Sequence, residues 1–205
     1  MRPRPPLRKL FPLGLLLFTT LACNFVSRLS REIEKAGQPT VLTSPDGRFQ
    51  LTIPGGWRKD TELNEKAEIS ASNRAREMYV VVLSESKRDF ASDMTLEKFT
   101  ELSRNAMMGN VRGAQATAPT PTSVSGHPAM QYELRGTVEN VNIAYLNTTV
   151  ETPGDYHQII AWTLPSRFND NQATLREVTQ SFKESALAPP GKPAPSVPPG
   201  AKTKR

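Results

Sequence analysis

Two adjacent stretches of alternating residues near the middle of the chain constrain its fold most. Apolar and polar side chains alternate through residues 129–138, with Met130, Tyr132 and Leu134 on one face. Residues 141–151 alternate in the same way, and only Glu139-Asn140 separates the two stretches. Successive side chains of a strand point to opposite faces, and a two-residue link containing Asn favours a tight turn. The sequence therefore predicts a long antiparallel hairpin with one face toward a core.

Further strands and two helices are predicted around this hairpin. Alternation or continuous apolar character predicts strands at 48–53, 67–72, 77–84 and 156–164. One helix is expected from Ser92 to Asn110, with caps offered by Ser92, Asp93 and Thr95 and a stop at Gly109. A closing helix is expected over 168–182, where Phe168, Leu175, Val178 and Phe182 form one stripe.

The order of these elements indicates an α+β fold. Residues 111–125 are small and polar and contain proline, so they are expected to be a connection, with an edge strand near 122–125. Strands grouped as an antiparallel β-sheet and helices set apart from them are typical of the α+β class.

The two ends of the chain differ in composition from this central part. Residues 1–9 are basic, residues 10–22 are apolar, and Cys23 follows, which is the layout of a secretory leader. Thirteen apolar residues are too few to cross a hydrocarbon core about 30 Å thick. The Pro-rich residues 185–205 are expected to be an extended tail outside the fold.

The segment Thr20-Leu21-Ala22-Cys23 resembles the lipobox of bacterial lipoproteins, although Thr20 stands where that pattern prefers an aliphatic residue. The resemblance implies cleavage between Ala22 and Cys23 (a signal peptide at 1–22) and attachment of acyl chains such as palmitate to Cys23. Asn24 follows, which by the family's sorting rule favours the outer membrane where there are two membranes. The protein would then be exported and anchored in the cell envelope, facing the periplasm. Residues 23–40 would be a tether, either an amphipathic helix or a frayed segment.

The net charge of +6 does not indicate a nucleic-acid partner. Eight of the 26 basic residues lie in the two ends, which contain no acidic residue, so 18 basic residues face 20 acidic residues in the middle. Nucleic-acid binding requires a concentrated positive surface that neutralises phosphates. The central part lacks such an excess, so we expect no nucleic-acid partner.

Several short motifs resemble the PsbP-like domain. Residues 44–57 (SPDGRFQLTIPGGW) are similar to the opening of that family, and residues 124–129 (VSGHPA) to the turn before its long hairpin. The end of the chain also matches, with a strand, then 165–168 (PSRF), then a helix closing on Ser181-Phe182. The resemblance covers residues 41–184 and implies a PsbP-like α/β/α sandwich, an antiparallel sheet packed between helices. Its photosynthetic member helps to retain inorganic ions at a membrane complex, but no ion-binding motif can be transferred to this chain.

No catalytic constellation is found in the sequence. There is no G-x-S-x-G elbow, no P-loop and no G-x-G-x-x-G. The two histidines, His127 and His157, are too few and too far apart for a metal site, and turn or strand-surface roles are expected for them. We therefore predict no catalytic residue, metal or cofactor.

Aromatic residues are the candidates for a binding site. Trp57 and Trp162 stand at strand ends, where they either anchor the core or line a cleft, and Tyr132 and Tyr145 lie on the hairpin. Three functions remain open from the sequence. The first is a non-catalytic envelope lipoprotein that binds a protein partner or assists a membrane complex. The second is a carrier of a small apolar or amphipathic ligand, and the third is an enzyme of unfamiliar type.

Overall fold

The structure is a computed structural model that describes residues 37–185. The predicted leader, the lipidation site at Cys23 and the Pro-rich tail lie outside the described residues. The chain divides into two compact units, Met1–Thr40 with Pro54–Gly56 and Val41–Ile53 with Trp57–Arg205. The sheets and helices below belong to the second unit, apart from the first residue of β1.

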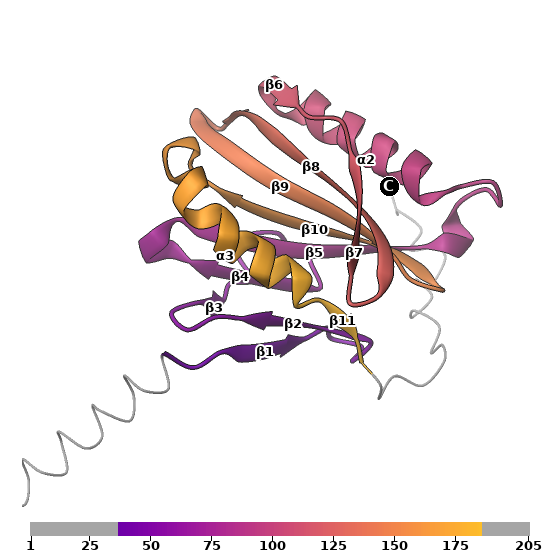
Figure 1. The fold of residues 1–205 in the computed structure, drawn as a ribbon, viewed down its shortest axis with the longest axis horizontal. Coiled ribbons are helices and arrows are strands. Elements are labelled where there is room, and N and C mark those ends of the chain that lie inside the picture. Colours follow the sequence, from indigo (N-terminus) through magenta and orange to yellow (C-terminus); the bar gives the residue numbers. More distant parts are fainter. Residues whose placement is uncertain (1–36, 186–205) are drawn as a thin grey trace, which may run out of the picture. The chain divides into compact units, whose positions relative to one another are not determined.

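The main element is an eight-stranded antiparallel sheet in the order β3-β4-β5-β10-β9-β8-β6, with β7 also paired to β8 (Figure 1). Its strands are β3 Arg58–Lys59, β4 Ile69–Asn73, β5 Met78–Ser86, β6 Arg112–Ala116, β7 Thr120–Val124, β8 His127–Val138, β9 Val141–Glu151 and β10 Asp155–Thr163. A small second sheet has the order β1-β2-β11, with β1 Thr40–Thr43, β2 Phe49–Ile53 and β11 Lys183–Glu184.

The predicted hairpin is confirmed. β8 and β9 pair from Ala129↔Val150 to Val138↔Val141, so only two residues form the turn. Both of them, Glu139 (φ 48°) and Asn140 (φ 68°), have positive φ. Two successive positive φ values are characteristic of the type I′ turn, whose twist matches that of the strands.

The two helices cover opposite faces of the large sheet, which confirms the α+β class (Figure 1). α2 (Leu96–Asn110) contacts β8, β6 and β9, whereas α3 (Phe168–Gln180) contacts β10, β9, β5 and β2. α2 begins four residues later than predicted, because the Thr95 side chain accepts a hydrogen bond from Lys98 N and caps the helix. Three 3₁₀ turns, η1 Arg74–Arg76, η2 Lys87–Asp89 and η3 Pro165–Arg167, complete the fold.

The largest core cluster lies on the α3 side of the large sheet. The small sheet supplies Phe49, Leu51 and Ile53 to it, and each of these is at most 1% exposed. The predicted stripe of the closing helix is buried there too, with Leu175, Val178 and Phe182 fully covered. Two smaller clusters lie under α2, one around Phe99 and Tyr156 and the other around Tyr132 and Leu134.

Two short strands share the outer edge of β8. β7 pairs with its first half and β6 with its second half, so the chain runs along β8 twice in succession. The edge strand predicted near 122–125 is confirmed as β7, but β6 was predicted as part of a connection. Its sequence RGAQA carries no strand pattern, and a bulge at Gly113 (φ 64°) interrupts its register. Pairing with β8 therefore determines this strand, not its own residues.

Gly136 in β8 lies where β6 crosses closely. A Cβ atom at this position would overlap Val111 Cγ1 and lie 3.0 Å from the carbonyl oxygen of Arg112. Gly136→Ala should therefore lower the free energy of unfolding by about 1–3 kcal/mol in a urea titration. Gly154→Ala is the matched control, because a Cβ at Gly154 meets nothing within 4 Å, and it should change stability by no more than about 0.5 kcal/mol. Equal effects of the two substitutions would contradict this account of β6.

Candidate functional site

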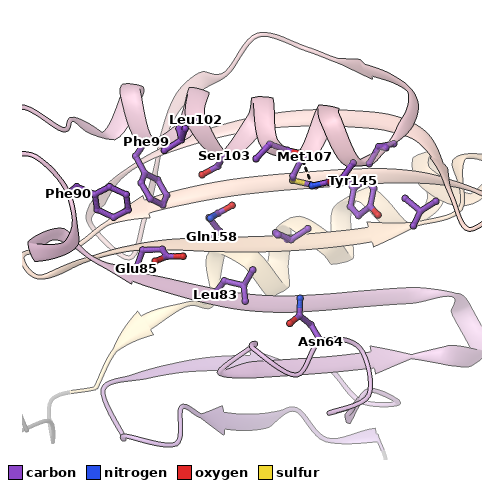
Figure 2. Close-up of a pocket in the computed structure, with 15 residues that line it drawn as sticks. Asn64, Leu83, Glu85, Phe90, Phe99, Leu102, Ser103, Met107, Tyr145 and Gln158 are labelled. Carbon is purple, nitrogen blue, oxygen red and sulfur yellow. Dashed lines mark hydrogen bonds between the residues drawn. The ribbon is translucent and has the colours of Figure 1, made fainter. Parts of the chain in front are cut away.

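A cleft of about 640 Å³ lies between α2 and the part of the large sheet that α2 leaves open (Figure 2). It forms because α2 covers β8 and β6 but not β10 and β5, whose residues on this face remain half-exposed. The volume lies within the range of sites for small ligands. The residues that line it are Asn64, Leu83, Glu85, Phe90, Phe99, Leu102, Ser103, Ala106, Met107, Asn110, Val111, Val138, Tyr145, Gln158 and Ile160.

The walls of the cleft are largely apolar. Figure 2 shows Phe99, Ser103 and Met107 extending from α2 toward the strands that carry Leu83 and Gln158. Leu102 of α2 is 54% exposed, although its place in the helical pattern had suggested the core face as an alternative. Glu85 is the one charged residue of the lining, and it is exposed at the surface. The cleft therefore offers apolar surface without a strong field of either sign.

Strand register brings two of the four predicted aromatic residues together. Trp162 pairs with Tyr145 of β9 and with Tyr79 of β5, and it stacks on the Tyr79 ring at a centroid distance of 5.3 Å. Tyr145, whose ring centroid is 6.0 Å from that of Trp162, lines the cleft. Tyr79 was not among the predicted residues, because its proximity to Trp162 depends on the β5–β10 register.

The other two predicted residues do not line the cleft. Trp57 is 6% exposed and belongs to the large core cluster with α3. Tyr132 is 2% exposed beneath α2, where its hydroxyl donates to Met107 Sδ at 3.4 Å. Burial raises the pKa of both Tyr132 and Tyr145, so these phenols stay neutral at physiological pH.

Two buried polar side chains beside the cleft lack hydrogen-bond partners. Asn147 and Thr149 of β9 are fully buried, and neither Asn147 Oδ1 nor Thr149 Oγ1 is paired. Asn147 Nδ2 donates at 3.0 Å to the thioether sulfur of Met107, which is a weak acceptor. An unpaired buried polar group costs about 1–3 kcal/mol, so this pair is expensive in the unliganded fold.

A second polar cluster, on the α3 face, is fully paired. The Ser84 hydroxyl donates to Glu68 Oε2 at 2.6 Å and lies 2.7 Å from His157 Nδ1, and Thr152 Oγ1 lies 3.2 Å from His157 Nε2. The expectation of a strand-surface role for His157 was wrong: the side chain is 1% exposed, between the rings of Phe49 and Phe182. Strand alternation places it on the face that the small sheet covers.

The Ser84–His157 contact is not arranged for nucleophilic catalysis. A catalytic serine gives its proton to the histidine, whereas the Ser84 proton is directed to Glu68 and the histidine must then donate through Nδ1–H. Burial lowers the pKa of His157 to about 4, which leaves the ring neutral, and burial raises the pKa of Glu68. Among residues 37–185, no group of three or more His, Cys, Asp or Glu side chains could hold a metal ion.

Comparison with known proteins identifies the fold. No family model and no curated protein matches the chain. Among solved structures, cyanobacterial PsbP (CyanoP) from Synechocystis sp. PCC 6803 matches with 15% identity and a TM-score of 0.54, over 72% of this chain and 93% of its own. LpqN of Mycobacterium tuberculosis, described as involved in cell envelope biogenesis, matches with 14% identity and a TM-score of 0.55, over 72% and 91%. The fold is therefore PsbP-like, as the sequence motifs had indicated.

No helix within residues 37–185 is long and apolar enough to cross a membrane.

The burial of His157 predicts a pH-dependent stability. Its pKa is lower in the folded protein than in the unfolded chain, so stability is lost as the pH falls from about 6.5 toward 4. Between pH 7 and pH 5 this residue should lower the free energy of unfolding by about 2 kcal/mol. Glu68, whose pKa is raised, acts in the opposite direction, losing stability as the pH rises.

Urea titrations of the wild type and of His157→Gln at both pH values isolate the histidine, because glutamine can bond to Ser84 and Thr152 but does not titrate. The variant should lose most of the difference in stability between pH 7 and pH 5. His127→Gln, at the start of β8, is the control and should keep it. An unchanged difference in His157→Gln would show that other groups cause the pH dependence.

Proposed function

We propose that this chain is a non-catalytic binding protein of the cell envelope, anchored through Cys23, and that it binds its partner in the cleft beside α2. The observation that carries the proposal is the cleft itself, an apolar, half-exposed surface on a sheet whose other face is covered. Exposed apolar surface of this kind characterises sites of interaction.

The chemistry of the cleft favours binding over catalysis. Its polar lining residues are mostly uncharged, with Ser103, Asn110 and Gln158 among them, and Glu85 is exposed. A general base must be held near the proton that it removes, usually with a perturbed pKa. The histidine that has such a pKa, His157, lies on the opposite face of the sheet, under Phe49.

The proposed location rests on the leader, on Cys23 and on the fold. A lipid attached at Cys23 would hold the protein at the membrane, because each buried methylene of an acyl chain contributes about 0.8 kcal/mol. LpqN, which has the same fold, is involved in envelope biogenesis. Asn24 favours the outer membrane in an organism that has two membranes.

Substitution of the anchoring cysteine tests the location. In Cys23→Ala cells, the protein should move from the membrane fraction to the soluble fraction and should no longer incorporate labelled palmitate. Ala22 and the rest of the leader are unchanged in this variant, so export should continue. Membrane attachment that persists without label would rule out the lipid anchor.

Substitution in the cleft tests the binding site. Leu102→Glu places a charge on an exposed wall of the cleft and should reduce cross-linking to the partner in intact cells by about tenfold. Val41→Glu is the matched control, since Val41 is 52% exposed in β1 of the small sheet, and it should leave cross-linking unchanged. Equal cross-linking of the two variants would place the binding site elsewhere.

A further inference from the structure

Buried polar groups under α2 adjoin the apolar cleft. In the β9–β10 pairing, Thr149 lies opposite Gln158, and Asn147 lies opposite Ile160. Directly opposite residues share one face of a sheet, so Thr149 and Asn147 lie on the face that carries Gln158 and Ile160. Both Gln158 and Ile160 line the cleft. The unpaired atoms Asn147 Oδ1 and Thr149 Oγ1 are therefore next to its floor.

Met107 separates these polar groups from the cleft. It lines the cleft, and its sulfur accepts from Asn147 Nδ2 at 3.0 Å and from Tyr132 Oη at 3.4 Å. A thioether is a weak acceptor, and the unbranched methionine side chain changes rotamer easily. A ligand oxygen in place of this sulfur would offer both donors a better acceptor. Its own hydroxyl or amide hydrogens could then reach Asn147 Oδ1 and Thr149 Oγ1.

The charges around the cleft select the kind of polar group. No lysine or arginine lines the cleft, so an anionic group at the floor would be buried without a counter-charge. Glu85 is exposed at the surface and is hydrated there, so it does not require a cation. An uncharged group with hydroxyl or amide hydrogens matches the unpaired amide and hydroxyl.

The burial of the floor indicates a small ligand in preference to a protein segment. Asn147 and Thr149 are fully buried, so a side chain docked across the mouth of the cleft would touch Leu102 and Tyr145 but not the floor. A slender molecule can enter beside Met107. Its apolar part would then lie against Leu83, Leu102 and Ile160.

We infer that the cleft binds a small uncharged amphiphile, with its polar group at Asn147, Thr149 and Gln158 and its apolar part along α2. The inference rests on the proposed function only in taking the cleft as the binding site. Met107 acts in it as a movable cover over the polar floor.

Equilibrium dialysis with three probes of equal chain length tests the head group. The probes are octyl glucoside, octyl sulfate and octyltrimethylammonium, each used below the concentration at which it forms micelles. The protein is the full chain with Cys23→Ala, so that no acyl group competes for the cleft. Octyl glucoside should bind with a stoichiometry of one, at least about fivefold more tightly than either charged probe.

Two threonine substitutions on neighbouring residues test the floor. Thr149→Val keeps the shape but removes the unpaired hydroxyl, so it should weaken octyl glucoside binding about fivefold and leave the melting temperature equal or higher. Thr148→Val is the matched control on the opposite face. Its hydroxyl accepts from Gln131 Nε2 at 2.8 Å, so this variant should lose stability and keep its affinity.

Each other result overturns the inference in a distinguishable way. Equal or tighter binding of a charged probe would exclude the uncharged head group. Unchanged affinity in Thr149→Val would show that ordered water alone satisfies the floor. If no probe binds but Leu102→Glu still abolishes cross-linking, the cleft binds a protein, and the proposed function survives without this inference. If no probe binds and Leu102→Glu cross-links normally, both fail.

Discussion

The large sheet has two extended faces, and the chain provides one long helix for each. A helix of 15 residues is about 22 Å long, whereas eight strands span more than about 30 Å across the sheet. On the α3 side the small sheet β1-β2-β11 makes up the difference with Phe49, Leu51 and Ile53, and the largest core cluster forms there. The α2 side has no such supplement, so β5 and β10 keep apolar side chains near solvent. The cleft is the consequence of this asymmetry.

The two polar clusters of the sheet show how differently buried polar groups can be treated. Around His157, each polar atom has a partner, and the neutral ring joins Ser84 to Thr152. A paired cluster of this kind fixes the position of neighbouring strands and changes little. Beside the cleft, Asn147 and Thr149 retain free hydrogen-bonding atoms at similar burial. Native proteins rarely retain such atoms without a reason, and the reason is most often functional.

Local patterns made much of the fold predictable. Strict alternation located β8 and β9, the Asn140 turn set their register, and the stripe on 168–182 located α3. What failed depended on partners distant in the sequence. β6 is a strand only because β8 holds it, and the burial of His157 requires Phe49 of the small sheet to lie above it. For the candidate site, the sequence identified Tyr145 and Trp162 as aromatic candidates. The roles of Tyr79, Met107 and the polar floor follow from cross-strand register and from where α2 ends.

The edges of the large sheet limit how this protein can associate with others. β6 and β7 occupy the outer edge of β8 end to end, and the opposite edge is β3, two residues long and made of Arg58 and Lys59. Short, basic or interrupted edges resist the addition of a foreign strand. Crowding at a membrane surface, where anchored copies would meet often, is therefore tolerated without sheet-to-sheet polymerisation. An open face can remain available for recognition because the edges are closed to growth.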